Sequence, residues 1–160
     1  MIVAVTGHRK LGHHPDEIMK VFREKLRLSE ATAVCSGMAL GFDQLVVEEC
    51  LALGIPVHGY IPCAEQDKFW PLSCRLRYAT LIQQIKQAGG KIIYVSDQPY
   101  AGPTDMERRN RAMVDVCNQV IAYWNGDSGG TANCVRYSLM KHRQITNLWK
   151  DLPCPLSQQT

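Results

Sequence analysis

The sequence has none of the features that mark a membrane, secreted or disordered protein. No apolar run approaches the roughly 18 residues that a membrane span needs, and residues 1–5 lack the charged start and long apolar middle of a signal peptide. Charged residues make up 21% and apolar residues 46% of the chain, which excludes the composition of disordered proteins. These absences predict a cytoplasmic protein whose 160 residues fold as one domain.

Standard cofactor and metal motifs are also missing. The chain has neither the G-x-G-x-x-G spacing of dinucleotide-binding domains nor the G-x-x-x-x-G-K-[ST] of a P-loop. Its seven cysteines are scattered, odd in number and not closely paired, which predicts reduced thiols. His8, His13 and His14 have no carboxylate or cysteine at ligand spacing, so we predict a polar loop there. We therefore expect neither a metal nor a cofactor.

Neither sign of charge is in large excess in the sequence. The net charge is +3 with a pI near 8.5, which suits a small anionic ligand but is too weak to indicate nucleic acid. We therefore expect a small-molecule partner, and the charge argues against a nucleic-acid partner. A homodimer is compatible with the sequence, although no segment defines its surface.

Hydrophobic periodicity predicts strands and helices in alternation. Short β-branched runs predict strands at 2–6, 32–35, 57–61, 91–95, 120–124 and, more weakly, 145–149. Helical spacing predicts helices at 15–28, 42–53, 78–85, 106–117 and 131–142. The alternation predicts a three-layer, doubly wound, Rossmann-like α/β domain over residues 1–150, with a mostly parallel sheet of five to six strands. Residues 151–160, with two prolines, are expected to form a loose tail.

Two glycine-rich turns connect a predicted strand to a predicted helix. They are residues 36–43 (SGMALGFD) and 126–131 (GDSGGT). In a doubly wound sheet such turns lie at the carboxyl ends of the strands, where ligands bind. Glycine permits close backbone approach, and a helix start presents free N–H groups and a positive dipole end, which suits phosphate. The alternative is that Ser128 or Thr131 merely caps a helix.

The candidate ligand residues come from several of these loops. We predict phosphate or ligand contacts from Gly7, Arg9, Ser36, Gly37, Gly41, Arg109, Asn110, Ser128, Gly129, Gly130 and Thr131. Asn110 lies on the apolar face of its helix, so its amide either anchors a neighbouring loop or binds the ligand. Trp70 and Tyr100 are candidates to border a base, although a tryptophan beside a proline also serves as a packing lid.

These motifs together resemble a known family. TGHR at 6–9, SGMALGFDQ at 36–44, RRNRAMVD at 108–115 and IAYWNGDSGGTAN at 121–133 are similar to segments of the SLOG superfamily. That superfamily includes the Smf/DprA DNA-processing proteins and the Lonely-guy enzymes, and the closest likeness is to its YpsA-like branch, small Rossmann-like proteins of bacteria and phages. The resemblance implies a nucleotide or nucleotide-derived ligand, such as AMP or ADP-ribose, between the two glycine turns.

Three functions follow from the resemblance. The leading one is binding or sensing of such a nucleotide, with Arg9 and Arg109 on the phosphate and Asp43 on the ribose. The second is N-glycosidic hydrolysis or transfer, but the position of the Lonely-guy catalytic glutamate holds Cys134, which leaves Asp43 or Glu48 as the carboxylate. The third is single-stranded DNA binding, against which the modest charge and the lack of a basic–aromatic stripe weigh.

Overall fold

The short β-branched runs of the sequence form one parallel sheet. The computed structural model describes residues 1–158, and its strands are β1 (Ile2–Gly7), β2 (Ala33–Ser36), β3 (Val57–Ile61), β4 (Lys91–Tyr94), β5 (Gln119–Tyr123) and β6 (Gln144–Asn147). They lie in the order β4-β3-β2-β1-β5-β6, and every neighbouring pair is parallel. The central strands are almost wholly buried, because helices cover both faces of the sheet.

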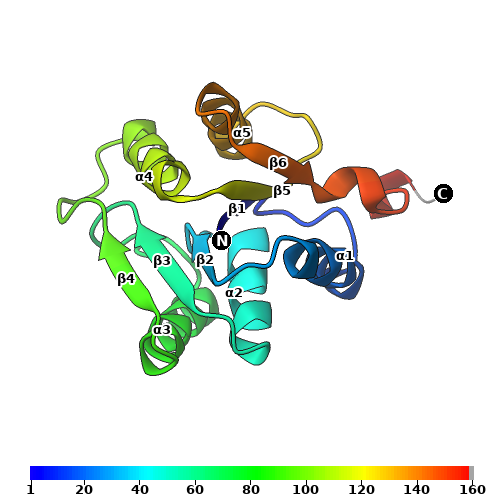
Figure 1. Ribbon diagram of the computed structural model, residues 1–160. Coiled ribbons are helices and arrows are strands. Elements are labelled where there is room, and N and C mark those ends of the chain that lie inside the picture. Colours follow the sequence, from blue (N-terminus) through cyan, green and yellow to red (C-terminus); the bar gives the residue numbers. More distant parts are fainter. Residues whose placement is uncertain (159–160) are drawn as a thin grey trace.

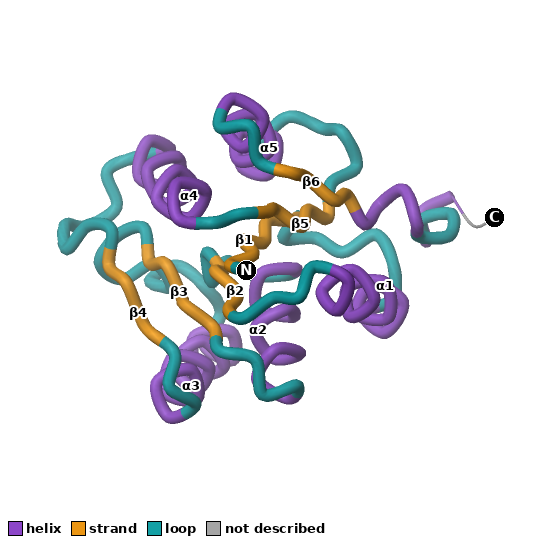
Figure 2. The backbone as a smooth tube through the Cα atoms, viewed as in Figure 1, coloured by secondary structure: helices purple, strands orange, loops and turns teal. Residues whose placement is uncertain are grey.

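Two layers of helices enclose the sheet (Figure 1). Helices α1 (Pro15–Leu28), α2 (Phe42–Ala52) and α3 (Leu72–Gln87) cover one face, and α4 (Pro103–Val116) and α5 (Gly130–Met140) cover the other, as Figure 2 also shows. The chain winds outward from β1 to β4, then returns through α4 to β5 on the other side of β1. The predicted three-layer, doubly wound fold is confirmed, and the winding direction reverses between β1 and β5. In such folds a crevice forms at that reversal.

Some predicted boundaries are wrong for local reasons. Helix α3 begins at Leu72 rather than near residue 78. The sequence pattern did not indicate its first turns, because Leu72 and Leu76 are exposed and these turns carry no apolar periodicity. Helix α4 begins at Pro103 rather than 106, since proline suits the first helical position. Strand β6 ends at Asn147, whose side chain accepts from the Trp149 N–H at 3.2 Å and starts a short 3-10 helix, Leu148–Asp151.

A cluster of aromatic rings packs under the α1 side of the sheet. Tyr123 stacks on Phe42 with ring centroids 5.4 Å apart, and Trp149 lies 4.9 Å from Tyr123. His13, which we predicted in a polar loop, is instead buried within this cluster, and its Nδ1 lies 2.9 Å from the Tyr123 hydroxyl. Burial is feasible because both ring nitrogens have hydrogen-bond partners. Its aromatic neighbours come from distant parts of the sequence.

The C-terminal segment runs back against the loop after β1. The Leu156 N–H donates to the Gly12 carbonyl at 2.9 Å, and His13 Nε2 lies 2.9 Å from the Pro153 carbonyl oxygen. Of the predicted tail 151–160, residues 159–160 lie outside the described residues. None of the helices described between residues 1 and 158 is both long and apolar enough to cross a membrane.

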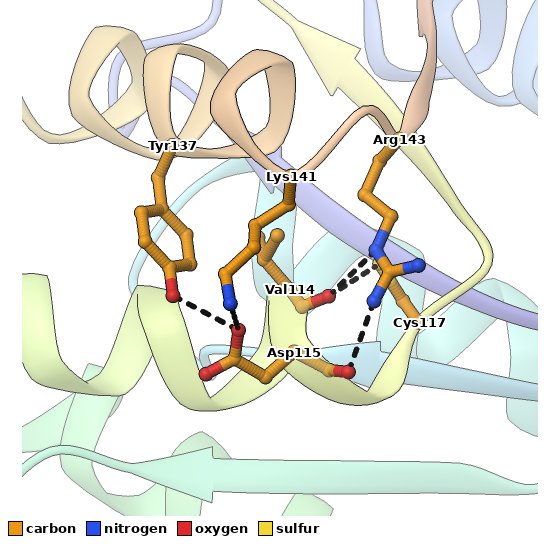
Figure 3. A network of polar contacts seen from close by, with 6 residues as sticks. All are labelled: Val114, Asp115, Cys117, Tyr137, Lys141 and Arg143. Carbon is orange, nitrogen blue, oxygen red and sulfur yellow. Dashed lines mark hydrogen bonds and ion pairs between the residues drawn. The ribbon is translucent and has the colours of Figure 1, made fainter.

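Polar contacts join α4 to α5 and to the chain that follows it (Figure 3). The Tyr137 hydroxyl donates to Asp115 Oδ1 at 2.9 Å, and Lys141 Nζ lies 3.0 Å from the same oxygen. Arg143 donates to the carbonyls of Val114 and Asp115 at 3.2 and 3.1 Å, which satisfies backbone groups at the end of α4. These contacts fix the relative position of the two helices.

The turn before α2 requires glycine at position 41. Gly41 has φ 84°, and a Cβ there would overlap the Arg9 backbone. We predict that Gly41→Ala lowers the free energy of unfolding at least twice as much as Gly54→Ala, measured by urea denaturation. Gly54 also has positive φ, at 70°, but nothing lies within 4 Å of an added Cβ. The Gly54→Ala variant should therefore lose only about 1 kcal/mol of unfolding free energy, from the unfavourable backbone conformation. Equal losses in the two variants would contradict the predicted clash.

Candidate nucleic-acid interface

A cavity of about 640 Å³ opens beyond the carboxyl ends of β1 and β5, where the winding direction reverses. We call it the crevice. Its walls come from the loops after β1, β2, β4 and β5 and from the first turns of α4 and α5. The lining residues are Thr6, Gly7, His8, Arg9, Ala39, Asp43, Tyr100, Pro103, Met106, Glu107, Arg109, Asn110, Ser128, Gly129, Gly130, Thr131, Asn133 and Arg136.

The start of α5 forms one open wall of the crevice. Ser128, Gly129 and Gly130 are exposed, and nothing lies within 4 Å of a Cβ built on either glycine. Gly129 has φ 135°, precedes the helix and carries no side chain to cap it. The first N–H groups of α5 and the positive end of its dipole are therefore open to an anion. A phosphate group fits this arrangement.

Two buried side chains of α4 link the predicted glycine turns. Arg109 donates from Nη1 to the Gly37 carbonyl and from Nε to Asn110 Oδ1 at 2.9 Å. The Asn110 amide in turn donates to the Gly130 carbonyl at 3.2 Å. The two turns thus meet at one edge of the sheet, and Asn110 anchors a neighbouring loop, one of the two roles that its position suggested.

The first glycine turn contributes only Ala39 and Asp43 to the crevice wall, and its glycines are not among the lining residues. Gly37 is buried, and its carbonyl also accepts from the Gln66 amide at 3.2 Å. The N–H groups of Met38 and Ala39 donate to Ser36 Oγ and Asp43 Oδ2, at 3.2 and 3.4 Å. These donors are already satisfied within the turn, so the start of α5 is the more accessible anion site.

Asp43 is the predicted catalytic residue that reaches the crevice. It is 5% exposed, and burial raises its pKa to about 6, although the charges of Arg109 and Arg9 oppose that rise. Burial also lowers the pKa of Arg109. Cys134, which stands at the position of the Lonely-guy glutamate, is fully buried, and burial raises the pKa of its thiol to about 11. The thiol therefore stays protonated and unreactive at neutral pH.

Two other predicted residues, Glu48 and Trp70, lie outside the crevice, whereas Tyr100 lines it. Glu48 accepts a hydrogen bond from Arg77 at 2.7 Å on the outer side of α2 and α3. Trp70 packs edge-on against Tyr78, with ring centroids 5.2 Å apart, and is not part of the crevice wall. Tyr100 does line the crevice and is 51% exposed. Of the two base or lid candidates, the structure brings only Tyr100 to the crevice.

Sequence reasoning missed several crevice residues, of which Arg136 carries the most weight. Asn133 and Arg136 were not predicted, and they line the crevice four and seven positions after the predicted Gly129. Residues at that spacing lie on one face of a helix, so the helical period starting from the glycine turn contained the signal.

Within residues 1–158, no three His, Cys, Asp or Glu side chains are grouped as a metal site requires.

The buried carboxyl of Asp43 gives a pH dependence of stability. Its folded-state pKa of about 6 lies above the ordinary value of 3.8, so ionisation opposes folding. The cost is absent below about pH 4, grows as pH rises to about 6, and is complete above it. We predict that Asp43→Asn gains stability relative to wild type between pH 4 and pH 7 by about 2 kcal/mol, measured by denaturant unfolding at both pH values. A difference that does not change with pH would refute the buried carboxyl.

Comparisons with known proteins identify the family. The fold defines a Rossmann-like α/β protein with a crevice at the reversal point. The model of the DNA recombination-mediator protein A family matches residues 1–160, and the chain belongs to that family. The uncharacterised SPbeta prophage-derived protein YoqJ of Bacillus subtilis is 26% identical over 139 residues, which cover 77% of this chain and 78% of YoqJ.

Two solved structures share the fold. DNA processing protein A of Helicobacter pylori, described with a single-stranded DNA binding mode, has a TM-score of 0.68 and 22% identity over 91% of this chain. DprA of Streptococcus pneumoniae has a TM-score of 0.62 and 19% identity over 89% of this chain. The matches cover 63% and 48% of those two chains, so this chain spans less than two thirds of their length.

The matches confirm the resemblance to the SLOG superfamily through its Smf/DprA members. They contradict two expectations, a small nucleotide as the ligand and the argument against a nucleic-acid partner, because the family and its structural neighbours are DNA-processing proteins. The nucleotide ligand was inferred from the glycine turns and the family resemblance. The argument against nucleic acid rested on the lack of a basic–aromatic stripe and on the net charge of +3, which describes the whole chain and not where its cations lie. The YpsA-like branch and the cytoplasmic location stay predictions.

Proposed function

We propose that this chain binds single-stranded DNA and that the crevice holds the strand by its phosphate backbone. The family match over residues 1–160 and the DNA-binding neighbour from Helicobacter pylori support a nucleic-acid partner. The observation that carries the proposal is the pairing of an open helix start with exposed arginines in one cavity.

Two exposed cations flank the open start of α5. Arg9 and Arg136 both line the crevice, and neither takes part in an ion pair found among residues 1–158. Their guanidinium groups are free to donate charge-assisted hydrogen bonds to phosphate oxygens while the Gly129–Gly130 backbone approaches from the other side. Such contacts read the backbone and not the bases, so we expect binding with little sequence preference.

The remainder of the crevice suits one unstacked nucleotide. Its volume of about 640 Å³ is in the range of small-ligand sites, and the Tyr100 ring and the Met106 side chain offer apolar surface at its wall. Stacking of a base on an aromatic ring contributes about 1–3 kcal/mol and tolerates any base. A duplex keeps its bases stacked on each other, which favours a single strand as the ligand.

The exposed arginines provide the test. We predict that Arg9→Gln and Arg136→Gln each weaken binding of a labelled oligo-dT of about 15 nucleotides roughly 5- to 10-fold near 0.1 M salt. Each change should also reduce the slope of log K against log salt by about 0.7, because one phosphate contact is lost. Fluorescence anisotropy over a salt series measures both quantities.

Arg27→Gln is the matched control. Arg27 is exposed on α1, away from the crevice, and forms none of the ion pairs described for residues 1–158, so its loss removes one charge without a crevice contact. The proposal fails if wild type gives no anisotropy change at low salt. It also fails if Arg27→Gln weakens binding as much as Arg136→Gln.

A further inference from the structure

A second cavity adjoins the crevice. It measures about 860 Å³ and lies between the loop after β1, the loop after β5 and the C-terminal segment. His8, Arg9 and Ser128 line both cavities, so the two share a wall and lie side by side. We propose that the second cavity holds the nucleotides next to the one bound at α5, which makes the two cavities one track for a single strand. This inference rests on the proposed function.

The side chains of the second cavity combine cations with aromatic rings. Arg9 and Lys10 are exposed, and Lys10 forms no ion pair within the described chain. The Trp149 ring lies in the wall, half-buried, with its centroid 6.0 Å from that of His8. The acidic side chain here, Asp127, already accepts a hydrogen bond from the Asn125 amide at 2.8 Å. A basic groove with an aromatic surface is typical of single-stranded nucleic-acid sites.

The aromatic wall is held in place before any ligand arrives. Trp149 packs edge-on against His13, with centroids 4.7 Å apart, and lies 4.9 Å from Tyr123. The segment opposite is tied down by the hydrogen bond from the Leu156 N–H to the Gly12 carbonyl. A ring that is already ordered loses little entropy when a base stacks on it. The second cavity is therefore preorganised for stacking.

The sizes of the two cavities support a shared strand. Sites for single-stranded nucleic acid cover about 4–16 nucleotides in known binding domains, more than one crevice of about 640 Å³ encloses. A phosphate at the start of α5 lies next to Arg9 and Ser128, the residues of the shared wall. The strand therefore has a continuous cationic path from Arg136 through Arg9 to Lys10.

The test compares two oligonucleotide lengths. We predict that Lys10→Gln weakens binding of a 15-nucleotide oligo-dT about 5-fold. The inhibition constant of a competing thymidine dinucleotide, which fills only the crevice, should stay unchanged. Lys20→Gln, an exposed lysine on α1 without a described ion pair, is the control and should match wild type for both ligands. Anisotropy of the labelled 15-mer measures both arms.

Tryptophan fluorescence gives an independent reading. Trp149 is one of three tryptophans, with Trp70 and Trp124. The 15-mer should quench the emission of wild type and of Trp70→Phe, and Trp149→Phe should lose most of that quenching. A thermal melt shows whether Trp149→Phe is folded. If it is unfolded, the binding test with Lys10→Gln, which changes an exposed residue, decides whether the second cavity holds the strand.

The outcomes separate this inference from the function on which it rests. Wild type that binds neither ligand overturns the proposed function and the track with it. Wild type that binds the 15-mer, with Lys10→Gln unchanged in affinity, overturns the track and leaves the crevice as the DNA site. Equal weakening of both ligands by Lys10→Gln also overturns the track, because it places Lys10 at the crevice itself.

Discussion

The buried guanidinium of Arg109 is the contact on which the geometry of the site depends. It joins the Gly37 carbonyl to Asn110, and Asn110 joins α4 to the Gly130 carbonyl at the start of α5. Burying a cation is costly unless its donors are satisfied and an opposite charge is near. Asp43 supplies that charge, and Gly37 leaves room for the guanidinium because a Cβ there would overlap it. Arg109 and Asn110 together thereby link the two glycine turns, with the Asp43 carboxyl nearby.

This arrangement distinguishes the arginines of the crevice. Arg109 lines the crevice but is buried and donates to Gly37 and Asn110, so it positions the loops and adds to the positive potential. Arg9 and Arg136 are exposed and available for phosphate. The local pattern explains why a net charge of +3 misled the sequence analysis. Affinity for a polyanion depends on the few cations that meet its phosphates and not on the net charge of the chain.

The fold could be predicted because each central strand is buried on both faces and each reads as a continuous apolar run. The periodicity failed at the start of α3, where Leu72 and Leu76 face solvent and the helix has no core to pattern against. The glycine turns located the edge of the sheet that holds the crevice. Their unequal accessibility could not be predicted, since it depends on Gln66 and Arg109, which reach Gly37 from other loops.

Contacts between distant segments were likewise beyond sequence reasoning. His13 and Trp149 come from opposite ends of the chain, and only the packing of the C-terminal segment against the loop after β1 brings them together. That packing places an aromatic ring beside the cations of the first loop, which is the basic–aromatic combination that no stretch of the sequence displays. The second cavity, which lies between the loops after β1 and β5 and the C-terminal segment, therefore depends on contacts between segments that are distant in the sequence.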